Sequence, residues 1–291
     1  MLFYVLFEGV LLPMYLILGI CGSRERKVRA AYLLFLYTLI SSFFMFLAIL
    51  CIYFTLGTTD YLLLKTFHLD AGVERFCWLA FFLSFAVKMP LVPFHIWLPE
   101  AHCEAPTSGS IILAGILLKL GGYGLIRFSI GLFPDASSFF TPLVFTVSVF
   151  GILYASFTTL QQVDLKKIVA YSSVAHMGVV TIGIFSGNSQ SLVGSIFLML
   201  SHGVVSGALF LLVGLLYERY STRVVKYYGG LISTMPLFSF FFIIFILANI
   251  GAPSTSNFVS ELLIFLGCYQ INSWASFFAA TGLVLGASYS L

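Results

Sequence analysis

The sequence predicts an all-α polytopic membrane protein with about nine transmembrane helices. Hydrophobic residues make up 60% of the 291 residues and charged residues only 9%, against roughly 25% charged in an ordinary soluble domain. Several apolar runs reach the length of about 20 residues that a helix needs to cross roughly 30 Å of hydrocarbon. These observations exclude a water-soluble globule.

Nine apolar segments follow one another along the chain, separated by short polar connectors. None of the connectors is long enough to form a soluble domain, so we expect a single membrane domain over residues 1–291. The expected spans lie at about 3–20, 30–56, 76–98, 106–131, 139–160, 168–186, 191–217, 236–268 and 273–291.

The third and eighth spans are interrupted. The third breaks near Lys88-Met89-Pro90, and the eighth breaks over Gly251–Asn257. Proline removes a backbone donor and clashes with the preceding turn. A broken helix is tolerated at membrane depth only where it faces protein or a wet cavity. A matching pair of breaks five spans apart predicts two inverted structural repeats, as in many transporters.

Basic residues in the connectors predict the topology. If nine spans alternate, one face of the membrane carries nine basic residues and the other carries Lys65, Arg75 and Arg127. By the positive-inside rule, the richer face, here called the basic face, is cytoplasmic or matrix. Lys88 and Lys119 belong to no connector, so we place them inside the membrane. The basic-face residues are Arg24, Arg26, Lys27, Arg29, Lys166, Lys167, Arg219, Arg223 and Lys226.

Charged residues interrupt four of the apolar spans: Glu8, Lys88, Lys119 and Glu261. A charge at the bilayer centre costs at least about 2.5 to 3.5 kcal/mol, so such residues indicate function. Burial disfavours the charged form of both residue types, which brings proton exchange toward neutral pH. We therefore predict a proton relay. The alternative is structural: Glu8 and Lys88 form an ion pair, while Lys119 or Glu261 reaches an interface.

Two histidines within the spans extend this prediction. His202 lies in the seventh span and His176 in the sixth. A neutral imidazole can pass a proton on because one ring nitrogen donates while the other accepts. His202 is the stronger relay candidate and His176 the weaker, since a lone histidine in a helix is more often a packing residue.

Other chemistries find little support in the sequence. The net charge of +3 is scattered, unlike the basic stripe of nucleic-acid-binding proteins, so no nucleic acid partner is expected. No phosphate-binding glycine loop occurs. The segment FHIWLPEAHCEAP gathers five residues that could ligate a metal, but its prolines interrupt a helix, and we expect its charged groups to be solvated at a membrane face. We therefore expect no metal at His95, Glu100, His102, Cys103 and Glu104.

Several motifs resemble one family. Residues 86–128, AVKMPLVPFHIWLPEAHCEAPTSGSIILAGILLKLGGYGLIRF, are similar to the antiporter-type proton-pumping subunits of NADH:ubiquinone oxidoreductase, respiratory complex I. Further similarity covers 7–22, 164–178, 201–223 and 251–265. Glutamate rather than lysine at position 261, together with the sequence YERYSTR, resembles the subunit 4 branch. The match runs from about the fifth to the thirteenth span of the family.

The resemblance implies roles for individual residues. Glu8 would pair with Lys88, Lys119 would be the central lysine, His202 a bridging histidine and Glu261 the terminal acid. A proton would pass from Lys119 toward Glu261, and withdrawing Glu8 from Lys88 would favour release of the lysine proton.

The resemblance also implies a setting. We expect no cofactor on this chain, with FMN, iron–sulfur clusters and ubiquinone carried elsewhere in the complex. The expected partners are other membrane-arm subunits, including neighbouring antiporter-like ones, a companion chain or accessory subunits that supply the remaining spans, and membrane lipids. The resemblance to the subunit 4 branch implies a location in the mitochondrial inner membrane, and 32 phenylalanines suit a T-rich organellar gene. A bacterial or plastid origin stays open at this point.

Two alternatives stay open at this point. The chain could be a subunit of a multi-subunit cation/proton antiporter, to which these subunits are related. It could also be a non-pumping structural membrane subunit whose buried charges only hold helices together.

Overall fold

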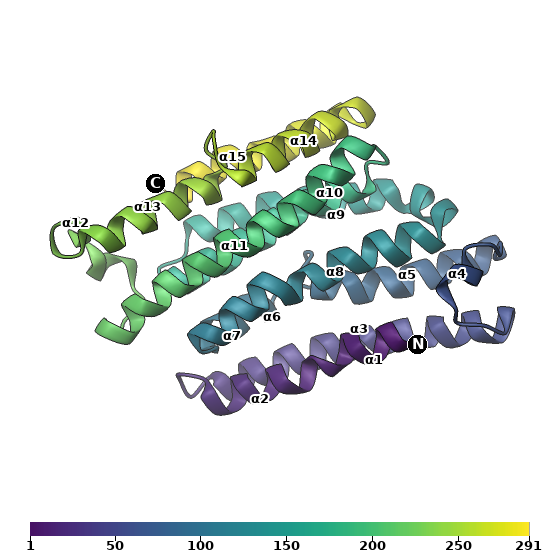
Figure 1. Ribbon diagram of the computed structural model, residues 1–291, viewed down its shortest axis with the longest axis horizontal. Coiled ribbons are helices and arrows are strands. Elements are labelled where there is room, and N and C mark those ends of the chain that lie inside the picture. Colours follow the sequence, from purple (N-terminus) through teal and green to yellow (C-terminus); the bar gives the residue numbers. More distant parts are fainter. Residues whose placement is uncertain (291) are drawn as a thin grey trace.

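The computed structural model describes residues 1–290 and is helical almost throughout (Figure 1). Within this range the extended pairing is a single isolated bridge between Asp164 and Val224. Six of the described helical segments are long and apolar enough to cross a membrane. The prediction of an all-α membrane protein is confirmed. The count of nine is approximate, because the other three expected spans form shorter or less apolar helices.

The first half of the chain contains the first four expected spans. The first span is α1 and α2, the second is α3, the third is α5 and α6, and the fourth is a helix with two π-helical stretches. The bounds are α1 Leu2–Gly9, α2 Leu11–Cys21, α3 Lys27–Leu56, α4 Tyr61–Leu64, α5 Ala71–Lys88, α6 Trp97–Glu104, α7 Thr107–Ile112, η1 Leu113–Leu117, α8 Leu118–Gly124 and η2 Leu125–Ile130.

The second half contains the remaining five expected spans. Three long helices come first, followed by a broken span and the final helix. The bounds are α9 Pro134–Leu160, α10 Leu165–Phe185, α11 Ser189–Tyr220, η3 Val225–Tyr228, α12 Leu231–Thr234, α13 Pro236–Ile250, α14 Ser256–Ile271 and α15 Ser273–Ser290.

Both helix breaks occur where the sequence predicts them. Helix α5 ends at Lys88, and the helix resumes only at Trp97, after the two prolines of the segment. Helix α13 ends before Gly251, whose φ of +77° is left-handed and therefore favours glycine. The relation of the two halves as inverted repeats stays a prediction.

The connectors assigned to the basic face meet at one end of the helices. The Ser23 amide donates to the Glu104 carbonyl at 3.2 Å, and the Leu165 amide donates to the Arg223 carbonyl at 2.9 Å. Arg223 Nη2 also donates to Ser23 Oγ at 2.6 Å. Four connectors that are far apart in the sequence therefore lie on one side, as the charge pattern predicts.

The expectation of solvated charged groups in the FHIWLPEAHCEAP segment is wrong for His102 and Glu104, which are buried. Two cations of neighbouring connectors, Lys166 and Arg223, are each 1% exposed as well. Lys166 Nζ donates to the Ala105 carbonyl at 2.9 Å, and Arg223 donates to the Cys103 carbonyl. The carbonyl groups at the end of α6 thus replace water as partners for these cations.

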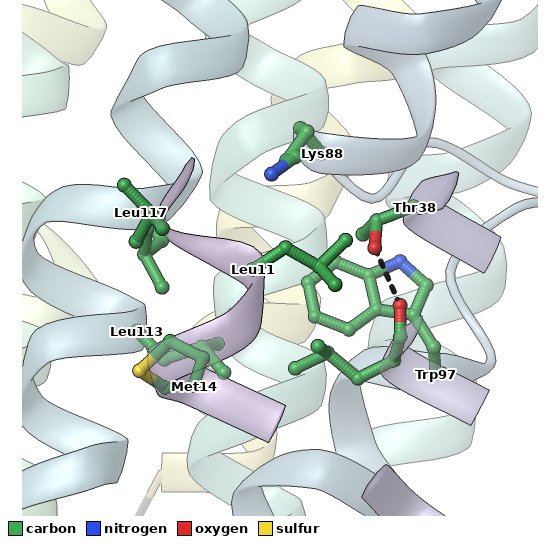
Figure 2. Close-up of a pocket in the computed structure, with 9 residues that line it drawn as sticks. Leu11, Met14, Thr38, Lys88, Trp97, Leu113 and Leu117 are labelled. Carbon is green, nitrogen blue, oxygen red and sulfur yellow. Dashed lines mark hydrogen bonds between the residues drawn. The ribbon is translucent and has the colours of Figure 1, made fainter. Parts of the chain in front are cut away.

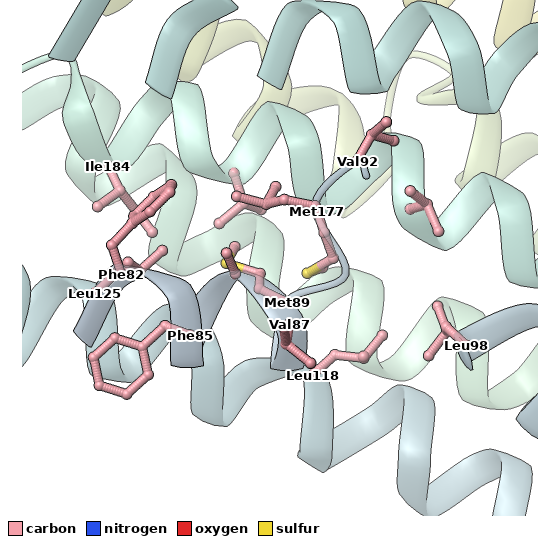
Figure 3. Packing of buried hydrophobic residues seen from close by; sticks show 14 of the residues in the cluster. Phe82, Phe85, Val87, Met89, Val92, Leu98, Leu118, Leu125, Met177 and Ile184 are labelled. Carbon is pink, nitrogen blue, oxygen red and sulfur yellow. The ribbon is translucent and has the colours of Figure 1, made fainter. Parts of the chain in front are cut away.

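The core lies between α5, α8 and α10 (Figure 3). Phe85, Met89, Leu118, Leu125 and Met177 are all fully buried there. Helices in lipid associate through van der Waals packing rather than through a hydrophobic force between them. This packed layer fixes the position of α8, which carries Lys119.

Candidate functional site

Lys119 projects from α8 toward α11. Its Nζ lies 3.0 Å from His202 Nδ1 and donates to the Ala114 carbonyl in the preceding π-helical stretch. A charged ammonium group only donates, so Nδ1 is the acceptor in that state. Gly203, the residue after His202, has no side chain that would obstruct this contact. A Cβ at residue 203 would lie 3.1 Å from the Gly115 carbonyl oxygen and 3.5 Å from Lys119 Cε. A glycine at 203 therefore lets α8 and α11 approach closely.

Glu261 contacts the second histidine. His176 Nδ1 lies 3.0 Å from Glu261 Oε1, and the two residues are 7% and 2% exposed. A Cβ on Gly251 would lie 2.7 Å from Glu261 Oε2. The break between α13 and α14 therefore provides the space that the carboxylate occupies.

The two histidines connect these contacts. The ring centroids of His176 and His202 are 5.4 Å apart, with the rings tilted by 52°. Lys119, His202, His176 and Glu261 thus form a continuous line, here called the central chain. Nε2 of each histidine is buried and has no hydrogen-bond partner among residues 1–290. A water molecule can bridge such groups, so the line suits proton transfer.

Glu8 and Lys88 lie apart from the central chain, and the ion pair implied for them is not closed. Lys88 Nζ lies 3.4 Å from the Phe7 carbonyl oxygen and 4.4 Å from the centroid of its ring. The ion pairs found across the described residues do not include Glu8 with Lys88. Adjacent helical residues point about 100° apart. Phe7 therefore takes the position that contacts Lys88, while Glu8, whose Oε1 is buried without a hydrogen-bond partner among residues 1–290, makes no closed ion pair with it.

A small cavity borders Lys88 (Figure 2). Its volume is about 20 Å³, enough for a water molecule. Thr38 and Trp97 line it beside apolar side chains of α2, α3 and η1. The Trp97 indole donates to the Val87 carbonyl at 2.9 Å, which fixes the wall of the cavity. Lys88 thus has space beside it rather than a bound carboxylate.

The structure brings together four of the six predicted site residues and leaves Glu8 and Lys88 as a separate pair. It also places two further polar residues, Asn249 and Tyr289, in the wall of the cavity beside Glu261. Asn249 could have been noticed as an amide within an apolar helix just before the break. Nothing in the local sequence marks Tyr289.

No metal site is evident among the residues that the structure describes. Groups of three or more histidine, cysteine, aspartate or glutamate side chains do not gather there. His102, one of the residues in the FHIWLPEAHCEAP segment, stacks on Phe210 with 4.3 Å between ring centroids. Packing accounts for its position.

The fold and the central chain define a class. A polytopic helical domain with two broken helices and buried lysine, histidine and glutamate in contact is an antiporter-like membrane domain. Residues 1–286 match the family described as "NADH:quinone oxidoreductase/Mrp antiporter, TM". The chain belongs to this family.

Relatives support the assignment. The "NADH-ubiquinone oxidoreductase chain 4" of Chondrus crispus is 62% identical over 291 residues, which is all of this chain and 59% of that relative. The chain therefore spans about 59% of the length of the curated relatives that it matches.

Solved structures share the fold. A chain of respiratory complex I from Thermus thermophilus with bound NADH is similar, with a TM-score of 0.94 and 35% identity over 99% of this chain and 62% of that chain. A chain of the Mrp complex from a Dietzia species matches with a TM-score of 0.90 and 25% identity over 99% of this chain and 55% of its own length.

Proposed function

We propose that this chain is a proton-translocating membrane-arm subunit of NADH:ubiquinone oxidoreductase in the mitochondrial inner membrane. Residues 1–291 would act as one membrane domain. The observation that carries the proposal is the central chain, whose two terminal contacts, from Lys119 to His202 and from His176 to Glu261, are each 3.0 Å. The relative named chain 4 and the similar chain in a complex I structure support the same function.

In the proposed mechanism the central chain passes a proton by exchange at each imidazole. The Lys119 ammonium gives a proton to His202 Nδ1, and His202 releases another from Nε2 toward His176. His176 then protonates the Glu261 carboxylate through Nδ1. Each step leaves its donor with one proton fewer and its acceptor with one more. The four residues of the central chain must therefore regain their starting protonation states before the next transfer.

Glu8 and Lys88 would control the moment at which Lys119 releases its proton. A positive charge on Lys88 disfavours a positive charge on Lys119, because like charges repel more strongly in a medium of low dielectric constant. Movement of Glu8 toward Lys88 would compensate that charge, and withdrawal would expose it. The open geometry around Lys88, with a cavity beside it, leaves room for this movement.

The redox chemistry would lie outside this chain. FMN, iron–sulfur clusters and ubiquinone would be held by other subunits, and neighbouring membrane-arm subunits would transmit a conformational or electrostatic signal. Companion or accessory chains and membrane lipids complete the proposed set of partners.

Substitution of Lys119 tests the proposal. In the assembled complex, Lys119→Ala should lower NADH-driven proton translocation at least about tenfold, because proton relays contribute about that much or more. NADH oxidation by ferricyanide should persist, since it does not require the membrane arm. Lys65→Ala, at an exposed lysine, is the matched control. Full proton translocation by an assembled Lys119→Ala complex would favour the structural role instead.

Exchange of a metal cation for protons is the second candidate function. It is favoured by the similarity to a chain of the Mrp complex, with a TM-score of 0.90. Mass spectrometry of the native complex discriminates between the two. Flavin and iron–sulfur subunits in the same particle, with NADH:quinone activity, support the respiratory function. Purification with other antiporter-like chains alone, together with Na⁺/H⁺ exchange in vesicles, supports the antiporter.

A further inference from the structure

A large groove opens at the basic face, between α10, α11 and α13 and the ends of α9 and α15. Its volume is about 530 Å³. We call it the basic-face groove. Leu209 and Val213 of α11, Phe242, Ile246 and Asn249 of α13, and Lys226 are among the residues that line it.

The depth of the groove corresponds to one leaflet of a bilayer. Its outer end is formed by Gln162 and Lys226 in the connectors of the basic face, and its inner end by Asn249, next to the last residue of α13. Leu209 on α11 lies 11 residues before the helix end at Tyr220, which is about 16 Å along the helix axis. Half of a hydrocarbon core is about 15 Å thick.

The lining is mostly apolar, with a polar side chain at the inner end, Asn249, as well as polar and charged ones at the mouth. Apolar side chains such as Ile168, Val213 and Phe242 form most of the wall, and Lys226 is the single charged residue in the part of the wall that the structure describes. An apolar cavity of about 150 Å³ already stays dry and takes up hydrocarbon. A larger, mostly apolar groove at the depth of one leaflet therefore suits a hydrocarbon chain, and Lys226 at its outer end suits a negative charge.

We propose that the basic-face groove binds one acyl chain of an anionic phospholipid, with the phosphate group beside Lys226. Three features match such a ligand: the leaflet depth, the apolar wall and the single cation at the mouth. The proposal does not depend on whether the chain pumps protons.

The position of the acyl chain has a structural consequence. Asn249 and Tyr289 line both the basic-face groove and the cavity beside Glu261. An acyl chain in the groove would pack against the outer side of this shared wall. It would therefore keep water of the basic face away from Glu261.

Photocrosslinking tests the proposal. The purified complex is placed in phosphatidylcholine nanodiscs with a phosphatidylglycerol that carries a photoreactive group on its acyl chain, and labelled peptides are mapped by mass spectrometry. We expect label in the peptides of α10, α11 and α13 that line the groove. Val213→Trp or Ile246→Trp should reduce this label to background by filling the groove. Val204→Trp, on the outer surface of α11, is the control and should leave it unchanged.

The headgroup is tested separately. Lys226→Glu should lower labelling by phosphatidylglycerol at least about fivefold, because the loss of one lysine contact with an anionic lipid already has about that effect, and should leave labelling by a phosphatidylcholine probe unchanged. Lys65→Glu is the matched control. The proposal is overturned if the groove peptides are not labelled, if both tryptophan variants leave the label intact in a folded complex, or if a protein segment occupies the groove.

Discussion

The two halves of the molecule hold their buried charges differently. In the first half, Lys88 at the end of α5 contacts the carbonyl and the ring of Phe7, and Glu8 remains apart. In the second half, Glu261 on α14 is hydrogen-bonded to His176. Proton transfer needs direct contact, whereas an electrostatic switch needs a charge that can move. The contact of Glu261 with His176 therefore suits proton transfer, together with Lys119 of the first half, whereas the gap between Glu8 and Lys88 suits a charge that can move.

The two helix breaks follow the same division. Prolines separate α5 from α6, and a small cavity borders Lys88 there. Gly251 separates α13 from α14, and the space gained is filled by the Glu261 carboxylate. One break thus leaves room for movement, while the other fixes an acid in place.

Breaking the central chain should give the largest effect. His202→Ala removes the group between Lys119 and His176, so we expect NADH-driven proton translocation to fall at least about tenfold. Proton uptake by vesicles containing the assembled complex is the measurement. His68→Ala, at an exposed histidine, should change nothing. A normal rate in His202→Ala would mean that the proton does not pass through this ring.

Filling the space at the second break should have the next largest effect. Gly251→Ala introduces both left-handed strain, about 1 kcal/mol or more, and a contact 2.7 Å from Glu261 Oε2. Gly230→Ala has the same φ of +77° but no atom within 4 Å. Gly251→Ala should therefore lower proton translocation several-fold by displacing Glu261, while Gly230→Ala should retain it. Equal rates of proton translocation in the two variants would show that the effect of Gly251→Ala comes from backbone strain alone and not from displacement of Glu261.

Neutralising Glu8 tests the control role of the first half. Because Glu8 makes no ion pair with Lys88 in this structure, Glu8→Gln should slow proton translocation only about threefold, less than a group in direct contact would. The same vesicle assay measures this, with Glu25→Gln on the basic-face connector as the control. A loss as large as that of His202→Ala would place Glu8 in the transfer path itself.

Separating η1, the stretch just before α8, slightly from α11 should give the smallest effect on proton translocation. A Cβ at residue 203 would lie 3.1 Å from the Gly115 carbonyl oxygen, whereas at residue 207 the nearest atom would be 3.6 Å away. Gly203→Ala should lengthen the contact between Lys119 and His202 and slow translocation less than about twofold. Gly207→Ala should be indistinguishable from the unmodified protein, and any larger effect there would contradict the helix packing described.

The sequence predicts much of this molecule because its signals are local. Apolar runs mark the spans, prolines and Gly251 mark the breaks, and lysines or glutamates in hydrocarbon mark the buried charges. The contact between His176 and Glu261 joins residues 85 positions apart, and no local pattern reports it. For the same reason His176 ranked below His202 in the sequence, although both belong to the central chain. Tyr289 and the buried state of Lys166 also depend on tertiary packing.

The π-helical stretches on either side of Lys119 give this lysine a way to change its partner. Residues 113–117 and 125–130 are both wound more widely than an α-helix, and they isolate the short helix α8. Such wide turns are frequent at functional sites. If the extra residue moves from one stretch to the other, α8 rotates by roughly 100° while the ends of the span stay in register with the membrane. Lys119 faces His202 in the register of this structure, and such a shift of register would turn it away without moving the rest of the span.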